Sequence, residues 1–229
     1  MKKQFRIFLF LFVCLAVFAC LYVYSRGGGG GGTGGGGNSG SGRGNIIYPI
    51  LWAIYTIITT FVLLFKSKKA KKIASSSPDD IWRIDNLEET AKNAFYNFQK
   101  AWMEKDLSSL SNFVTQRFYD EQNANLVNSL PGYKQNIIEC IQIKSIKIIA
   151  CRDYIDNSFD SFTANIKGSL IDYTINKKSK KILSGSSTEF EKFTDSYTFL
   201  RYNNQWLLDE VENDPMLGHF LNSKNYTEK

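Results

Sequence analysis

The sequence predicts an α+β domain in which N-terminal helices pack on a curved antiparallel four-stranded sheet, preceded by two hydrophobic membrane segments. Two apolar runs separated by a glycine-rich stretch occupy the first 65 residues. Apolar residues then recur at helical spacing as far as residue 130, and after residue 140 the period becomes two. Helices followed by a run of strands are typical of the α+β class.

The charge of the chain is divided unevenly between its two parts. The whole chain has a net charge of +6 and an isoelectric point near 9.0. Residues 1–77 hold ten basic and no acidic side chains, whereas residues 78–229 carry a net charge of −4. Because a domain with that charge neutralises few phosphates, we expect no nucleic-acid partner.

The composition also excludes several kinds of enzyme. The single histidine, His219, rules out a histidine metal cluster or a Ser/His/Asp triad. The sequence has no glycine-rich phosphate-binding motif and no paired carboxylates at a spacing that suits acid–base catalysis. We therefore expect a protein that is not an enzyme, with no catalytic residue, no metal and no cofactor.

Residues 1–26 form either a signal peptide or the first membrane segment. Lys2, Lys3 and Arg6 precede an uncharged, mostly apolar run at 7–24, a pattern that fits both alternatives. Residues 27–45 follow as a glycine-rich flexible linker, since residues 27–44 contain 13 of the 17 glycines. The alternative for this stretch is a low-complexity interaction tract.

Residues 46–65 are predicted to be a transmembrane helix. Twenty residues at about 1.5 Å each span roughly 30 Å, the thickness of the hydrocarbon layer. Tyr48, Trp52 and Tyr55 lie toward the first end of this run, where aromatic side chains meet the membrane interface. This segment is the second of the two predicted membrane spans.

A basic juxtamembrane linker is predicted at residues 66–84. A run of lysines at the end of a span marks its cytoplasmic side, which places the C-terminal domain in the cytoplasm. Such a run is either only a topology signal or also a docking site for anionic lipid headgroups. The lysines are Lys66, Lys68, Lys69, Lys71 and Lys72.

The domain proper is predicted at residues 85–212 and begins with helices. Asp85 and Glu88 have the spacing of a capping box at the start of a helix over 86–105. A short helix is expected near 107–113, and a third helix is expected to start at Thr115.

Four strands are expected after the helices, at 141–151, 162–175, 193–199 and 206–211. The apolar positions change face within each of the first two, which requires a bulge and therefore a bent sheet. A bent sheet against helices makes a cone with a hollow, where a ligand or partner segment would bind. A polar C-terminal tail is expected at 213–229.

Aromatic residues of the helices and strands are candidates to line this hollow as an apolar pocket, and the alternative is that they only fill the core. Arg201, in an otherwise apolar strand, either pairs with Asp209 or Glu210 or serves as a polar pocket residue that holds a lipid phosphate. The aromatic candidates are Phe95, Phe98, Trp102, Phe118, Tyr119, Phe162, Tyr197, Phe199 and Trp206.

Cys140 and Cys151 lie too far apart along one extended stretch to form a disulfide bond. Free thiols fit a reducing compartment, which agrees with a cytoplasmic domain.

Particular stretches resemble the Tim-44-like domain family. Residues 94–102 (AFYNFQKAW) and 106–115 resemble the start of that domain, and YTFLR at 197–201 with WLL at 206–208 resembles its end. The order of hydrophobic segment, glycine-rich stretch, second span and domain is similar to bacterial members. Tyr197 is a departure, because the family often has Trp there.

The resemblance implies a non-catalytic membrane-side adaptor with an apolar pocket. Mitochondrial members of the family tether a chaperone import motor to the inner membrane and contact cardiolipin, and a ribosomal member helps to hold the mitochondrial ribosome there. The motor-binding region of the mitochondrial tether is replaced here by the glycine-rich and membrane segments. Motor tethering is therefore not implied for this chain.

The sequence thus predicts an adaptor or tether of the bacterial inner membrane that acts in protein translocation or membrane-protein biogenesis. Its expected partners are anionic membrane lipid and a protein or peptide client, and a homo-oligomer is left open. The alternative is an extracytoplasmic assembly subunit of a secretion machine, or a small-ligand-binding module. Both would use the same cone-shaped roll, which resembles nuclear transport factor two and the cystatin-like folds.

Overall fold

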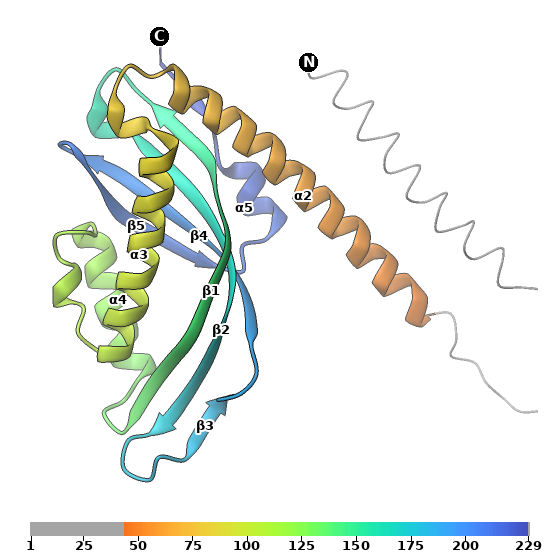
Figure 1. The fold of residues 1–229 in the computed structure, drawn as a ribbon, viewed down its shortest axis with the longest axis vertical. Helices are drawn as coiled ribbons and strands as arrows, with labels where there is room; N and C mark the ends of the chain where they lie inside the picture. Colours follow the sequence, from red (N-terminus) through yellow and green to blue (C-terminus); the bar gives the residue numbers. More distant parts are fainter. Residues whose placement is uncertain (1–43, 229) are drawn as a thin grey trace, which may run out of the picture. The chain divides into compact units, whose positions relative to one another are not determined.

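The computed structural model describes residues 44–228, so the predicted segment 1–26 and most of the glycine-rich linker lie outside the described residues. The chain divides into two compact units, Met1–Phe61 and Val62–Lys229. Figure 1 shows helices on both faces of a curled sheet.

A single helix, α2 (Gly44–Ser76), contains the predicted transmembrane run. Its part Tyr48–Ser76 contains an 18-residue window with a mean hydropathy of 1.9, and by length and composition it could cross a membrane. Within the described residues it is the one helix of this kind. The helix does not end at Phe65 but continues through the lysine run, so the predicted linker begins as helix rather than coil.

Four further helical elements follow in the order η1 (Asp80–Trp82), α3 (Ile84–Glu104), η2 (Ser108–Leu110) and α4 (Gln116–Ser129). The predicted capping box at Asp85 is wrong, because Arg83 occupies the N-cap of α3 without a side-chain hydrogen bond. The start of the next long helix is confirmed: the Thr115 hydroxyl accepts a hydrogen bond from the Phe118 amide at 3.2 Å.

The sheet has six strands in the described part of the chain, not four. Their order is β5-β4-β2-β1-β6, with β3 pairing to β2, and β6 runs parallel to β1, so the sheet is mixed rather than fully antiparallel. The four predicted strands correspond to β1, β2, β4 and β5. The strands are β1 (Lys134–Asp153), β2 (Ser161–Asn176), β3 (Ile182–Gly185), β4 (Glu191–Tyr202), β5 (Gln205–Asn213) and β6 (Tyr226–Thr227).

The two unpredicted strands share a physical reason for being missed. All four residues of β3 are exposed, so no alternation of apolar and polar side chains marks it. The other strand, β6, has only two residues, and its pairing with Arg152 and Asp153 depends on tertiary structure.

The bend of the sheet arises in β1. Its register against β2 shifts at three places, and Cys140 at the first of them has a left-handed φ of 53°. The bulge predicted for the first strand is therefore confirmed. The second strand, β2, keeps a regular register against β4 and shifts once against β3, between Thr174 and Ile175. These shifts make the curl that gives the sheet its half-barrel form.

Consecutive residues of β1 point to opposite faces and so belong to two cores. Ile148 lies in the large core under α3 and α4, and Ile149 packs with Leu63 of α2 and Phe220 of α5 (Leu217–Asn222). Figure 1 shows α5 and the end of α2 on the face of the sheet opposite to α3. The segment 213–228, expected as part of a polar tail, thus supplies the helix α5 to this face and the strand β6 to the edge of the sheet.

Candidate functional site

Asn225 connects the end of α2 to the sheet. Its side-chain oxygen accepts a hydrogen bond from the Cys151 amide at 2.9 Å. Its side-chain nitrogen donates to the carbonyls of Ile149 at 2.9 Å and Lys66 at 3.3 Å. One amide side chain therefore satisfies backbone groups on two elements that are far apart in sequence.

Two lysines of the basic run complete this connection. The Lys66 ammonium donates to the carbonyls of Ser223 and Leu221, the latter at 3.1 Å, and the Lys69 ammonium donates to the carbonyl of Asn225 at 3.1 Å. We call Lys66, Lys69 and Asn225 the anchor clamp. Because their ammonium groups bind the chain's own carbonyls, Lys66 and Lys69 are less available to lipid than the sequence suggests.

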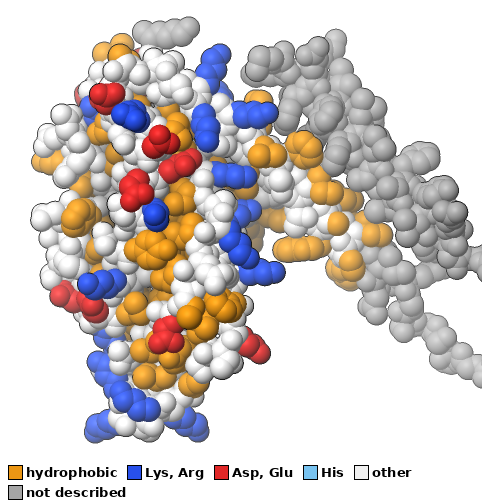
Figure 2. Space-filling view, in the orientation of Figure 1, with side chains coloured by type: hydrophobic (Ala, Val, Ile, Leu, Met, Phe, Trp, Pro, Cys, Tyr) orange, Lys and Arg blue, Asp and Glu red, His pale blue; other side chains and the backbone are white. Residues whose placement is uncertain are grey.

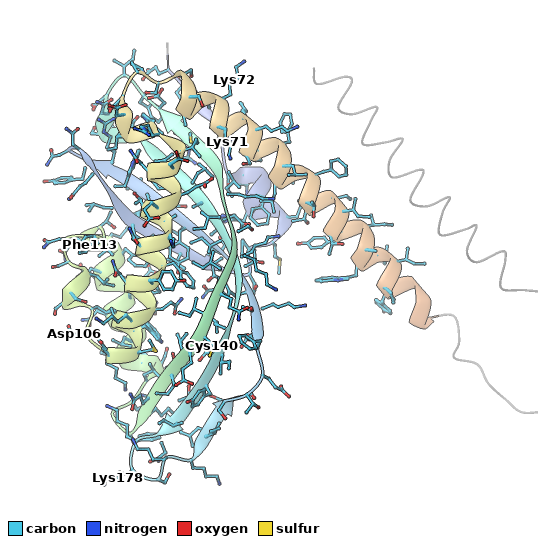
Figure 3. The ribbon with its side chains drawn as sticks, in the orientation of Figure 1. Lys71, Lys72, Asp106, Phe113, Cys140 and Lys178 are labelled. Atoms are coloured by element: carbon cyan, nitrogen blue, oxygen red, sulfur yellow. The ribbon has the colours of Figure 1, made fainter. Side chains whose placement is uncertain are left out.

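The other three lysines of the run remain at the surface. Lys71 lies 3.8 Å from Glu88 in an exposed pair, which contributes little to stability. Lys68 and Lys72 are exposed and make no hydrogen bond or ion pair within residues 44–228. Figure 3 labels Lys71 and Lys72 on α2 close to the start of α3, and Figure 2 shows basic side chains gathered along this side of the domain.

Arg201 forms a buried ion-pair network. Its guanidinium nitrogens lie 3.1 Å from the carboxylate of Asp160 and 2.5 Å from that of Asp79, and its side chain is only 4% exposed. The expected pairing with Asp209 or Glu210 is therefore wrong, since Asp209 instead pairs with Arg117 at 2.7 Å. The network fixes η1 to the sheet, because Asp79 caps that turn.

Arg201 also lines a polar surface pocket of about 480 Å³ with Asn157, Ser158, Asn203 and Asn204. Two carboxylates already neutralise its charge, so a phosphate in that pocket would compete with both of them.

Most of the aromatic candidates fill the core. Five of them are at most 2% exposed, and they contact one another as in the stacked pair Phe162 and Phe199, whose ring centroids are 4.5 Å apart. Trp206 donates its indole N–H to the Ile81 carbonyl at 3.3 Å, and Tyr119 packs half-buried against the core. The five are Phe95, Phe118, Phe162, Tyr197 and Phe199.

A cavity of about 350 Å³ lies between α3 and the sheet, where the bend of the sheet predicts a hollow. Phe98 and Trp102 of α3 line it, but the cavity is not the apolar pocket that we expected. It contains four carboxylates and no Lys, Arg or His, and we call it the acidic pocket. The other lining residues are Gln99, Gln122, Asn136, Ile138, Leu170, Asp172, Glu191, Phe193, Asp195, Asn213 and Asp214.

A second hollow of about 470 Å³ lies beside α3, and half of its lining residues carry amide side chains. Phe199 and Trp206 contribute to it, and so does Phe113, which is 55% exposed and is labelled in Figure 3. Amide groups offer both donors and acceptors, which suits the main chain of an extended peptide. The amides of this amide groove are Asn86, Asn93, Asn97, Asn112, Asn204 and Gln205.

Sequence reasoning missed Asn225 and the acids of the acidic pocket. Each is an ordinary polar residue in its own stretch, and no local pattern distinguishes it. Their roles arise from the fold, which brings together residues separated by up to 159 positions, as for Lys66 and Asn225.

Comparison with known proteins identifies a family and similar solved structures. The family described as "Tim44-like domain" matches residues 74–213. No curated protein sequence matches the chain. The crystal structure of the intermembrane space region of the chloroplast protein ARC6 is similar with 11% identity and a TM-score of 0.38, covering 55% of this chain and 95% of that one.

Proposed function

We propose that this chain, which belongs to the Tim44-like domain family over residues 74–213, is a non-catalytic membrane-associated adaptor. We place it in a bacterial inner membrane with the domain on the cytoplasmic side, in protein translocation or membrane-protein biogenesis. The lysine run after the apolar part of α2 supports that orientation.

The observation that carries the proposal is the continuity of α2. The same helix that is apolar enough to span a membrane continues into the C-terminal unit, where the anchor clamp and the packing of Leu63 on Phe220 attach it. A flexible linker would let the domain diffuse around its anchor. In this chain the apolar run and the start of the domain belong to one helix with no flexible linker between them, which keeps the domain near the membrane along the chain.

Anionic lipid is the first proposed partner. Of the five candidate lysines, we assign headgroup contact to Lys68, Lys71 and Lys72, because the anchor clamp uses the other two. A lysine near an anionic surface contributes about 1 kcal/mol. The amide groove with exposed Phe113 is the proposed seat of a protein or peptide client.

Replacing Lys68 and Lys72 with Gln in the full chain is expected to lower its preference for anionic over zwitterionic lipid about thirtyfold, since two contacts of about 1 kcal/mol each are lost. The preference is measured by native mass spectrometry of the detergent-solubilised chain, titrated with phosphatidylglycerol and phosphatidylcholine.

The matched control replaces Lys178 and Lys180 in the turn between β2 and β3, which lies at the other end of the domain in Figure 3. This control should keep the preference of the unaltered chain. An unchanged preference in the Lys68/Lys72 variant would remove lipid binding by the lysine run from the proposal.

A further inference from the structure

We propose that the acidic pocket binds an organic cation with an apolar stem: an alkylammonium group, carried by a lysine side chain of a partner segment or by a free amine. This inference deepens the proposed function, because it names the chemical group of the client that would be bound. Only the identification of the ligand with that client rests on the proposed function.

The charge of the pocket is of one sign. Its carboxylates come from separate parts of the fold: Asp172 from β2, Glu191 and Asp195 from β4, and Asp214 from just beyond β5. Among all of its lining residues there is no basic side chain to neutralise them. A partly enclosed cavity of this kind concentrates the field of its charges and attracts cations.

Asp195 is the one buried member of the four acids of the pocket. Only 6% of this residue is exposed, and its carboxyl group makes no hydrogen bond or ion pair with another side chain in the described part of the chain. The carboxyl group accepts a hydrogen bond from the Asp214 backbone amide, but the side-chain charge of Asp214 has the same sign, and no cationic side chain lines the pocket beside it. A buried carboxylate without a counter-ion is unfavourable, and a bound cation would supply the missing charge.

The remaining walls suit the apolar part of such a ligand. Phe98 and Trp102 lie side by side on α3 with ring centroids 6.1 Å apart, and Phe193 faces the cavity from β4. Aromatic faces attract ammonium groups as well as alkyl chains. Ile138 and Leu170 add aliphatic surface, and about 350 Å³ is at the small end of ligand sites.

A metal ion is a poorer fit than an organic cation. No three His, Cys, Asp or Glu side chains among the described residues are placed to hold a metal together. One of the four acids is already engaged, since Asp172 accepts a hydrogen bond from the Asn136 amide at 2.6 Å. The carboxylates would therefore attract a cation through their combined electrostatic field and would not coordinate a metal ion.

The test measures binding by calorimetry with the full chain in neutral detergent micelles. The probes are butylammonium and its uncharged counterpart butanol, together with acetyl-Ala-Lys-Ala-amide and the same peptide with norleucine in place of lysine. We expect saturable binding of both cationic probes and at least tenfold weaker binding of both neutral ones.

The double variant Asp195→Asn/Glu191→Gln should weaken binding of the cationic probes at least tenfold, and Trp102→Leu should weaken it several-fold. Glu89→Gln, an exposed carboxylate of α3 outside the pocket, is the matched control and should bind as the unaltered chain does. Thermal melts of each variant establish that it is folded.

Equal binding of charged and neutral probes, or undiminished binding of the cations by the double variant, would overturn the inference. Tighter binding of the lysine peptide than of butylammonium would support a protein client, and similar affinity would support a free amine. If the chain does not bind the cationic probes selectively but keeps its preference for anionic lipid, the inference fails and the proposed adaptor function stands.

Discussion

Replacing Arg201 with Leu is expected to lower the free energy of unfolding by about 3–5 kcal/mol. The Asp160 side chain is fully buried and would lose its counter-charge, keeping only the hydrogen bond from the Tyr154 amide at 2.7 Å. Burial already raises the pKa of Asp160, while Arg201 opposes that shift. Urea denaturation of the full chain in detergent, followed by near-ultraviolet circular dichroism, measures the change.

Two control variants distinguish the stability cost of breaking a buried ion pair from that of breaking an exposed one. Arg117→Leu removes the exposed arginine that pairs with Asp209 and should cost less than about 1 kcal/mol. Asp79→Asn removes the more exposed partner of Arg201 and leaves Asp160 paired, so its effect should be similarly small. A loss for Arg201→Leu no greater than that for Arg117→Leu would show that the buried network does not stabilise the fold.

Replacing Asp195 with Asn is expected to stabilise the chain at pH 8 by about 2–4 kcal/mol and to have almost no effect at pH 4. Burial raises the pKa of Asp195 from 3.8 to about 7, the charge of Asp214 adds to the shift, and the Asp214 amide opposes it. At a pH between these two pKa values, the Asp195 carboxyl group is protonated in the folded state and ionised in the unfolded state. Stability therefore falls as the pH rises from about 4 to about 7.

Thermal melts of the full chain at pH 4, 6 and 8 measure this profile. The groups that share the pocket with Asp195 are Asp172, Glu191 and Asp214, and the lining side chains of α3 and α4 carry no charge. Glu191→Gln removes an exposed carboxylate of the same pocket and should change stability by less than about 0.5 kcal/mol. If the stability of Asp195→Asn changes with pH in parallel with that of the unaltered chain at all three pH values, the raised pKa of Asp195 is contradicted.

The elements predicted from the sequence are those whose pattern is local. The period of apolar residues locates α3 and the four longer strands, and Thr115 marks the start of α4. Asp85 misled the prediction because it lies in the first turn of α3, two residues after the N-cap Arg83, and acidic residues are favoured at both positions. The short strands β3 and β6 leave no periodic signal, and their pairing is decided by neighbours distant in sequence.

The candidate site was harder to predict for the same reason. Aromatic residues at helical and strand spacing indicate burial but do not distinguish core from cavity, so Phe98 and Trp102 look no different in sequence from Phe95 and Phe118. The acids of the pocket are separated by up to 42 positions, from Asp172 to Asp214. The lysine run was recognised as basic, but the engagement of Lys66 and Lys69 with the C-terminal segment required the fold.

The side of the membrane on which the C-terminus lies decides whether the domain can act as a cytoplasmic adaptor. A reporter is fused after residue 229: either a fluorescent protein that folds only in the cytoplasm or a phosphatase active only outside it. We expect fluorescence and no phosphatase activity, because a run of lysines after a membrane span, as at the end of α2, is typical of the cytoplasmic side. Phosphatase activity without fluorescence would contradict the cytoplasmic adaptor and favour an extracytoplasmic assembly or ligand-binding module.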